Sequence, residues 1–179
     1  PDAIRQGSVM STQCMFGSAL AIEEELGLNQ WADECPSIEG LSVAVAGPDG
    51  RPALQWQARL TQRAQSVDQR LKIPAWMELF ERRGGRLLTA RAGIDDLEEL
   101  ADRHDLVIVA AGKGPIGALF ARDGARSPYD KPQRSLSLLA VHGLERDPDY
   151  DRVNFNIIPG VGEYFVMPGL THSGPYHSM

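Results

Sequence analysis

Residues 105–120 read DLVIVAAGKGPIGALF, a stretch that joins a continuous apolar run to a glycine-rich turn. The run from Leu106 to Ala111 is typical of a strand that is buried on both faces of a parallel sheet. Gly112, Gly114 and Gly117 then complete a literal G-x-G-x-x-G, the spacing that lets a backbone approach the pyrophosphate of a dinucleotide.

The residues that follow do not continue a dinucleotide-binding unit. Such a unit needs a helix, a second strand and an acidic residue about 20 positions further on. Here Gly117 is followed by Gly124, Pro128 and Pro132 without an apolar strand, so Asp130 falls in a loop. The sequence therefore favours a buried strand that runs into a glycine-rich turn over a pyrophosphate site.

The composition is that of an ordinary globular protein. With 179 residues, of which 42% are hydrophobic and 23% charged, the chain is long enough for one sizeable core. The net charge of −6 and the dispersed Lys and Arg residues disfavour nucleic acid and anionic membranes as partners. No apolar run approaches the roughly 18 residues of a transmembrane helix. Cys14 and Cys35 lack a metal-ligand spacing, so we expect reduced thiols in a cytoplasmic protein.

Three segments have helical patterns. The first follows Ser11 or Thr12 as its cap and ends at Gly27; we expect its acidic residues 23–25 to be solvated. The second begins at Ser66, which forms a capping-box pattern with Gln69, and residues 66–83 contain a proline that predicts a kink or break near residue 73. The third covers residues 95–103, where four acidic side chains are explained by solvation.

Strand patterns occur on both sides of these helices. Residues 41–57 form a hairpin pattern around the turn at 47–50, and residues 86–90 are expected to form a short strand. The alternating patterns in residues 136–168 predict an antiparallel sheet that continues the hairpin. The fold class is therefore α/β (α+β), with a mostly antiparallel sheet and a partial βαβ piece.

No motif for a self-sufficient active site is present. The chain lacks G-x-S-x-G, C-x-x-C, H-E-x-x-H and Walker patterns. His172 and His177 have poor spacing for zinc, and Lys113 is explained by solvent as readily as by a phosphate. We therefore assign neither catalytic residues nor a metal site.

Two long stretches point to a particular protein family more specifically than the patterns above. Residues 66–85 read SVDQRLKIPAWMELFERRGG, and residues 96–136 read DLEELADRHDLVIVAAGKGPIGALFARDGARSPYDKPQRSL. Together with residues 4–31, they resemble the oxygenase component of two-component styrene monooxygenases, in the flavoprotein hydroxylase superfamily. The chain starts at Pro1 and stops at Met179 directly after a patterned segment, so we expect an internal piece of such a protein, centred on its substrate-binding domain.

The resemblance implies an organisation and an activity. Residues 1–179 would form one structural unit, in which 1–35 and 58–133 are partial FAD-domain and connecting elements and 36–57 and 134–179 form the substrate-binding sheet. The parent enzyme would epoxidise or hydroxylate styrene- or indole-like aromatics with O2. It would use reduced FAD from a separate NADH-dependent flavin reductase, and a homodimer is an expected assembly.

The resemblance also implies which residues face the substrate. Met10, Ser11 and Thr12 fall where the family's chain passes between flavin and substrate, so Ser11 and Thr12 would also contact the cofactor. Leu41 and Val43 fall where the hairpin lines the pocket, although plain core packing explains these two residues equally well.

Ala111, Gly112 and Lys113 fall beside the family's nucleotide site and are the other cofactor-binding candidates. The family's flavin fingerprint and its later glycine-aspartate motif have no counterpart here, and neither Ser8 nor Val9 is basic as the family often has it. We therefore expect these 179 residues alone to retain no FAD and to be inactive.

Two other functions stay open at this point. One is a single-component aromatic hydroxylase that takes NAD(P)H directly. The other is a non-catalytic module that binds apolar ligands.

Overall fold

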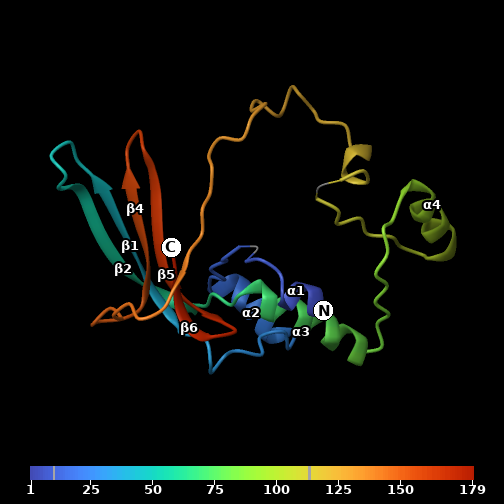
Figure 1. The fold of residues 1–179 in the computed structure, drawn as a ribbon, viewed down its shortest axis with the longest axis horizontal. Helices are drawn as coiled ribbons and strands as arrows, with labels where there is room; N and C mark the ends of the chain where they lie inside the picture. The colour runs from blue at the N-terminus through green and yellow to red at the C-terminus, as the bar shows by residue number, and fades with distance from the viewer. Residues whose placement is uncertain (10, 113) are drawn as a thin grey trace. The chain divides into compact units, whose positions relative to one another are not determined.

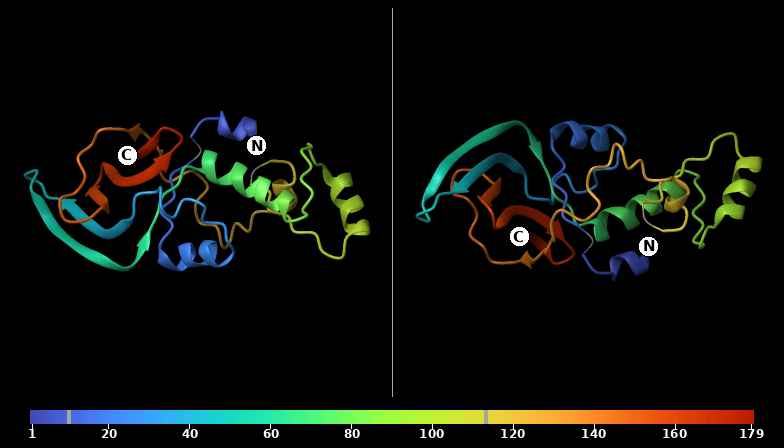
Figure 2. Two further views of the ribbon diagram at one scale, coloured as in Figure 1. Left: turned by 90° about the horizontal axis from the view of Figure 1, so that it is seen from below. Right: turned by 90° about the horizontal axis from the view of Figure 1, so that it is seen from above.

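The computed structural model describes residues 1–9, 11–112 and 114–179. The chain divides into two compact units, one formed by residues 1–85 and 137–179 and the other by residues 86–136. The first unit contains a six-stranded sheet with helices at one end of it (Figures 1 and 2). No helix in the described ranges is long and apolar enough to cross a membrane.

The sheet has the strand order β2-β1-β4-β5-β6-β3. All neighbouring strands are antiparallel except β1 and β4, which run parallel. The mixed α/β class with a mostly antiparallel sheet is thus confirmed, but the hairpin joins the C-terminal strands through a parallel pair. The strands are β1 (Ile38–Ala46), β2 (Pro52–Ala64), β3 (Ala140–Val141), β4 (Arg152–Ile158), β5 (Gly162–Thr171) and β6 (Gly174–Ser178).

The β1–β2 hairpin forms where the sequence predicts it. Gly47 N donates a hydrogen bond to Arg51 O at 2.7 Å, which closes the turn. Gly50 has a φ of +78°, a backbone conformation that would be strained in a residue with a side chain. An isolated hairpin is at best marginally stable, so β1 depends on its pairing with β4.

Two apolar clusters hold the first unit together. Ile38, Ala64, Val153 and Met167 are buried at one end of a sheet face, where Cys14 also packs. A second cluster joins the sheet to the segments that precede β1 and α3, because Leu170 of β5 packs against residues of both segments. Its members are Cys35, Val67 and Leu170, with Trp31 and Leu71 packed against them.

Helix α3 (Gln69–Arg82) differs from the prediction at its start and at its proline. Asp68, rather than Ser66, is the N-cap and accepts a hydrogen bond from Arg70 N at 2.8 Å. The Ser66 carbonyl accepts a hydrogen bond from Leu170 N at 2.9 Å, which keeps Ser66 outside the helix. Pro74 lies buried within one continuous helix, so the expected break does not occur.

Helix α2 (Gly17–Glu25) contains an ion pair that the sequence reading missed. Its N-cap is Phe16, without a side-chain cap, so Ser11 and Thr12 do not start the helix. Glu23 is buried and accepts from Lys72 Nζ of α3 at 2.6 Å, which corrects the expectation that this residue is solvated. Breaking such a buried pair typically costs 3–5 kcal/mol, which is about the range we expect here. Helix α1 (Asp2–Arg5) lies beside α3, where Arg5 pairs with Glu78.

The second unit contains α4 (Ile94–Arg103) and a short 3-10 helix, η1 (Gly117–Leu119). Helix α4 confirms the predicted helix, but residues 86–90 and 106–111 form no strand. Leu106 and Ile108 are 75% and 80% exposed, because no described strand pairs with this run. The partial βαβ piece is therefore not formed, and no described residue of 86–136 is buried.

The polar face of the sheet holds a packed aromatic residue at the β1–β4 junction. Tyr150 lies under the guanidinium of Arg59, which is 4.0 Å from the ring centroid, and Arg152 approaches it at 4.9 Å. A Cβ on Gly40 would lie 2.2 Å from the Tyr150 ring and 2.8 Å from the Ala58 carbonyl. Glycine is therefore required here for close approach.

We predict that Gly40→Ala destabilises the protein by about 1–3 kcal/mol, as overpacking of a filled site usually does. Urea unfolding followed by circular dichroism would measure the change. Gly162→Ala is the matched control, because a Cβ at this other strand glycine meets nothing within 4 Å. Equal stability of the two variants would contradict the packing of Tyr150 on Gly40.

Candidate functional site

One face of the sheet carries apolar side chains from neighbouring strands, and we call it the apolar face. Val43 of β1 lies opposite Trp56 of β2 and opposite Phe155 of β4, and Phe155 lies opposite Phe165 of β5. The rows of cross-strand partners on either side of this one are also apolar. They contain Leu54, Val45 and Ile157 on one side, and Ala58, Leu41 and Val153 on the other.

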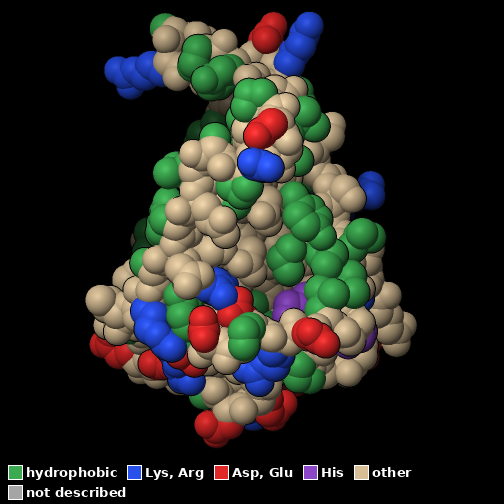
Figure 3. Space-filling view, turned by 90° about the vertical axis from the view of Figure 1, so that its left-hand side faces the viewer, with side chains coloured by type: hydrophobic (Ala, Val, Ile, Leu, Met, Phe, Trp, Pro, Cys, Tyr) green, Lys and Arg blue, Asp and Glu red, His purple; other side chains and the backbone are tan. Residues whose placement is uncertain are grey.

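The apolar face is buried at one end and open at the other. Its closed end is the cluster that contains Ile38 and Ala64, where Cys14 packs. At the open end, Trp56 is 45% exposed and Leu54 is 53% exposed. Figure 3 shows one face of the molecule, on which hydrophobic side chains gather in one area and charged side chains in another. Contiguous exposed apolar surface of this kind typically marks a site of interaction.

The opposite face of the same strands is polar. Gln57, Ser42 and Asn154 form one of its rows, in which the Ser42 hydroxyl donates to Asn154 Oδ1. In contrast, the members of these three rows on β1, β2 and β4 include no ionisable side chain and no side-chain hydrogen-bond acceptor, although on β5 the row of Val45 continues with Glu163. The open end is therefore suited to a ligand without charge, because burying a charge against it would be costly.

The structure places the substrate candidates as follows. Leu41 and Val43 are half-buried on the apolar face, and Leu41 packs against the core cluster at its closed end. Ser11 and Thr12 are half-buried in the segment that leads to Cys14, so the structure brings this segment to the same closed end. Met10 lies outside the described residues.

The remaining cofactor candidates lie in the second unit. Ala111 is half-buried and Gly112 is exposed in the turn before η1, while Lys113 lies outside the described residues. A Cβ at Gly112 would meet nothing within 4 Å, so the described residues form no close cradle for a phosphate there. The described residues therefore do not account for a nucleotide site.

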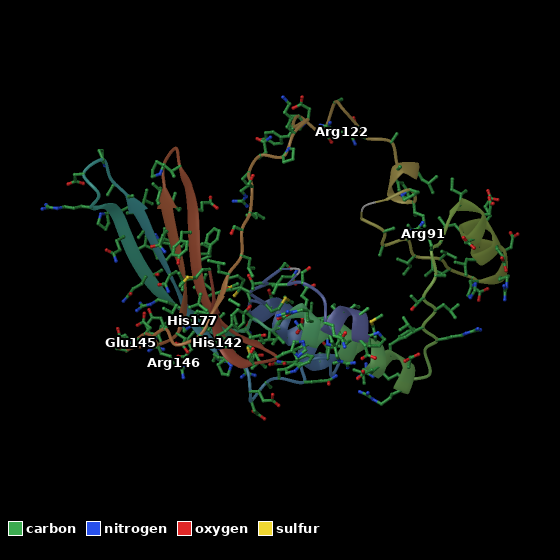
Figure 4. The ribbon with its side chains drawn as sticks, viewed as in Figure 1. Arg91, Arg122, His142, Glu145, Arg146 and His177 are labelled. Carbon is green, nitrogen blue, oxygen red and sulfur yellow. The ribbon has the colours of Figure 1, made fainter. Side chains whose placement is uncertain are left out.

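A concavity lies in the first unit, near β6, and was not predicted. It has a volume of about 400 Å³ and is lined by residues that include Glu34, Leu144, Arg146 and His177. Figure 4 shows Arg146 and His177 at one end of the sheet. These residues are far apart in the sequence, so the sequence alone did not indicate that they lie together. Arg146 is engaged by the buried carboxylate of Asp151, so it is held in place as half of an ion pair.

The described part of the chain offers little nucleophilic or metal chemistry. Burial raises the pKa of both the Cys14 and the Cys35 thiol to about 11, which keeps them protonated at neutral pH. No group of His, Cys, Asp and Glu in the described ranges could hold a metal ion.

The comparisons with known proteins agree with the resemblance stated above. Residues 112–179, which include β3 to β6, match the family model described as "Styrene monooxygenase A putative substrate binding domain". The chain is 31% identical over 159 residues to a styrene monooxygenase StyA from a Pseudomonas species, covering 88% of this chain and 37% of that protein. It is 29% identical over 174 residues to the StyA of Pseudomonas fluorescens, covering 97% of this chain and 41% of that protein.

The resemblance to styrene monooxygenases is thus confirmed. The chain spans about two fifths of the length of the curated relatives that it matches.

We predict that His177 makes the protein less stable in mild acid. Burial lowers the pKa of His177 below its ordinary 6.5, with a smaller upward effect from Asp151 and a downward one from Arg146. Between the two pKa values the unfolded chain binds more protons than the folded chain, so stability rises with pH in this window. Urea unfolding at pH 5 to 7.5 should show this slope in the wild type and a smaller slope in His177→Gln. His104→Gln, at an exposed histidine of the other unit, is the control for the loss of a histidine; identical slopes in all three proteins would contradict the assignment.

Proposed function

We propose that this chain forms the substrate-binding part of an FAD-dependent monooxygenase that acts on styrene- or indole-like aromatics. The observation that carries the proposal is the open apolar face of β1, β2 and β4, which has no ionisable side chain in its three rows. The similarity to styrene monooxygenases along most of the chain supports the same substrate class.

The chain's own residues would bind and orient the aromatic substrate. Burying its rings against Val43, Trp56 and Phe155 gains roughly 25 cal/mol for each Å² of apolar surface removed from water. The same contacts exclude water from the reacting edge. Reduced FAD, when bound, supplies the oxygen-activating chemistry, so the protein needs no acid–base pair of its own.

We further propose that residues 1–35 and 58–133 belong with an FAD domain, whereas residues 36–57 and 134–179 form the substrate-binding sheet; the pairing of β2 with β1 extends this sheet to Ala64. The exposed run at Leu106 and Ile108 supports this division, since such side chains normally pack against other elements. A separate NADH-dependent flavin reductase would supply the reduced FAD, and the working enzyme would be a homodimer. The 179 residues alone would not retain FAD.

The gene product that carries these residues is expected to convert styrene to styrene oxide in air, when it is supplied with FAD, NADH and a flavin reductase. The 179-residue chain alone is expected to form none and to release FAD on gel filtration. Val43→Asp should lower kcat/KM at least about 100-fold, because an unpaired charge on the apolar face costs several kcal/mol. Ala44→Asp, on the opposite face of β1, is the matched control.

Three outcomes would contradict parts of this proposal. Turnover with NADH and no reductase would indicate a single-component hydroxylase. Saturable arene binding without product under any condition would indicate a non-catalytic binding module. Equal loss of activity in both aspartate variants would place the substrate elsewhere.

We also predict that residues 104–111 become ordered only when an FAD domain is present. In the 179-residue chain their backbone amides should exchange with solvent at nearly the rate of an unfolded peptide. In the gene product that carries this chain, they should be protected at least about 100-fold, as amides of a paired strand are. Hydrogen exchange measured by mass spectrometry would test this, with β4 as the segment protected in both proteins. Fast exchange of residues 104–111 in both would rule the assignment out.

A further inference from the structure

The concavity near β6 combines apolar surface with ionisable groups of both signs. None of its lining residues belongs to the three rows of the apolar face, so it is a separate site. Pro168 and Tyr176 are buried and supply apolar surface at its base. Its charged residues come from two segments that are distant in sequence: Asp33 and Glu34 precede β1, whereas Arg146 lies between β3 and β4.

Arg146 is held in a way that leaves part of its guanidinium available. Its Nε donates to Oδ1 of the buried Asp151 at 3.3 Å, and its Nη2 donates to Oδ2 of the same carboxylate. Nη1 makes no hydrogen bond to any residue that the structure describes, and the Arg146 side chain is 72% exposed. A guanidinium binds carboxylates through two parallel N–H groups, so the edge formed by Nη1 and the second N–H of Nη2 can accept a further carboxylate.

A ligand with a single charge would fit this lining poorly. Asp151 already offsets the charge of Arg146, so a simple anion would gain little there and would be repelled by Asp33 and Glu34. Burial lowers the pKa of His177 below its ordinary 6.5, so this lining residue adds no second positive charge at neutral pH. A simple cation would attract the two carboxylates but would be repelled by Arg146. A ligand that carries both charges has a partner for each of them.

We infer that this concavity binds a free α-amino acid with an apolar side chain, whose carboxylate pairs with Arg146 and whose ammonium group pairs with Asp33 or Glu34. The inference goes beyond the proposed function and does not depend on it. The volume of about 400 Å³ is near the lower end of the range of about 300–1,000 Å³ for ligand sites, which suits one amino acid better than a peptide. The apolar side chain of the ligand would lie against Pro168 and Tyr176.

The expected affinity is modest. Asp33, Glu34 and Arg146 are all exposed, and ion pairs between exposed groups contribute little because water competes for both partners. The ligand's apolar side chain must therefore supply much of the binding free energy. We expect a Kd of roughly 1 mM.

The test titrates the gene product that carries this chain with L-leucine and measures binding by saturation-transfer NMR. L-Leucine should bind saturably. Leucinamide lacks the carboxylate and N-acetylleucine lacks the ammonium group, so each should bind at least about tenfold more weakly. Because the experiment uses no styrene, reductase or oxygen transfer, its outcome is independent of the epoxidation assay.

Paired variants locate the ligand. Asp33→Asn combined with Glu34→Gln removes both carboxylates and should weaken L-leucine binding at least about tenfold. Glu145→Gln combined with Asp149→Asn is the matched control, because these two exposed acidic residues lie close in sequence to Arg146 but do not line the concavity. Leu144→Trp adds bulk at a lining position that is 38% exposed, so it should block L-leucine without disturbing the core.

Three results would overturn the inference. The first is the absence of saturable L-leucine binding. The second is equal affinity for L-leucine and either of its two derivatives, since one of the charges would then have no partner. The third is unchanged L-leucine affinity in the folded Asp33→Asn/Glu34→Gln variant or, if that variant fails to fold, in Leu144→Trp.

Discussion

The parallel pairing of β1 with β4 is the constraint on which the rest of the sheet depends. It joins segments that are far apart in the chain, as the Ser42–Asn154 hydrogen bond shows across 112 positions. The register puts Val43 beside Phe155 and Ser42 beside Asn154, so apolar residues meet on one face and polar residues on the other. A slip by one residue would mix the two faces, and burial at the closed end would then be lost. Tyr150, packed on Gly40 between Arg59 and Arg152, reinforces this register from the polar side.

The parts of the fold that the sequence predicts correctly are the local ones. The β1–β2 hairpin follows from a short turn and an alternating pattern, and α4 follows from a helical pattern with acidic residues in its first turn. The run at 106–111 has an equally clear strand pattern, yet it remains unpaired and exposed. A strand is stabilised by its neighbours, so its pattern predicts a structure only where the partner strand is present. For the same reason, the parallel direction of the β1–β4 pair could not be deduced from either segment alone.

The candidate site was predictable only in part. Leu41 and Val43 came from a family resemblance, and alternation along β1 puts them on one face. Trp56 and Phe155 were not chosen, because their positions beside Val43 depend on the register of two separate strand pairs. The Glu23–Lys72 pair was missed for a similar reason: an acidic triplet in a helix looks solvated until a second helix supplies a cation. These misses all concern contacts between segments distant in sequence.

The chemistry of the apolar face also limits how selective this protein could be. A ligand on the apolar face would meet valine, leucine, isoleucine and aromatic side chains, of which only Trp56 has a polar group, its indole N–H, that could donate a hydrogen bond to it. Hydrophobic pockets separate ligands that differ by one methylene by only about 1–3 kcal/mol. Under the proposed function, styrene and indole would therefore compete for the same site, and shape alone would decide between larger arenes. Selection of the reacting position would come from the orientation that Trp56 and Phe155 impose, because Val43 and Val45 between them offer no polar group to fix it. An enzyme built on this face would thus be permissive toward ring substituents and strict about charge.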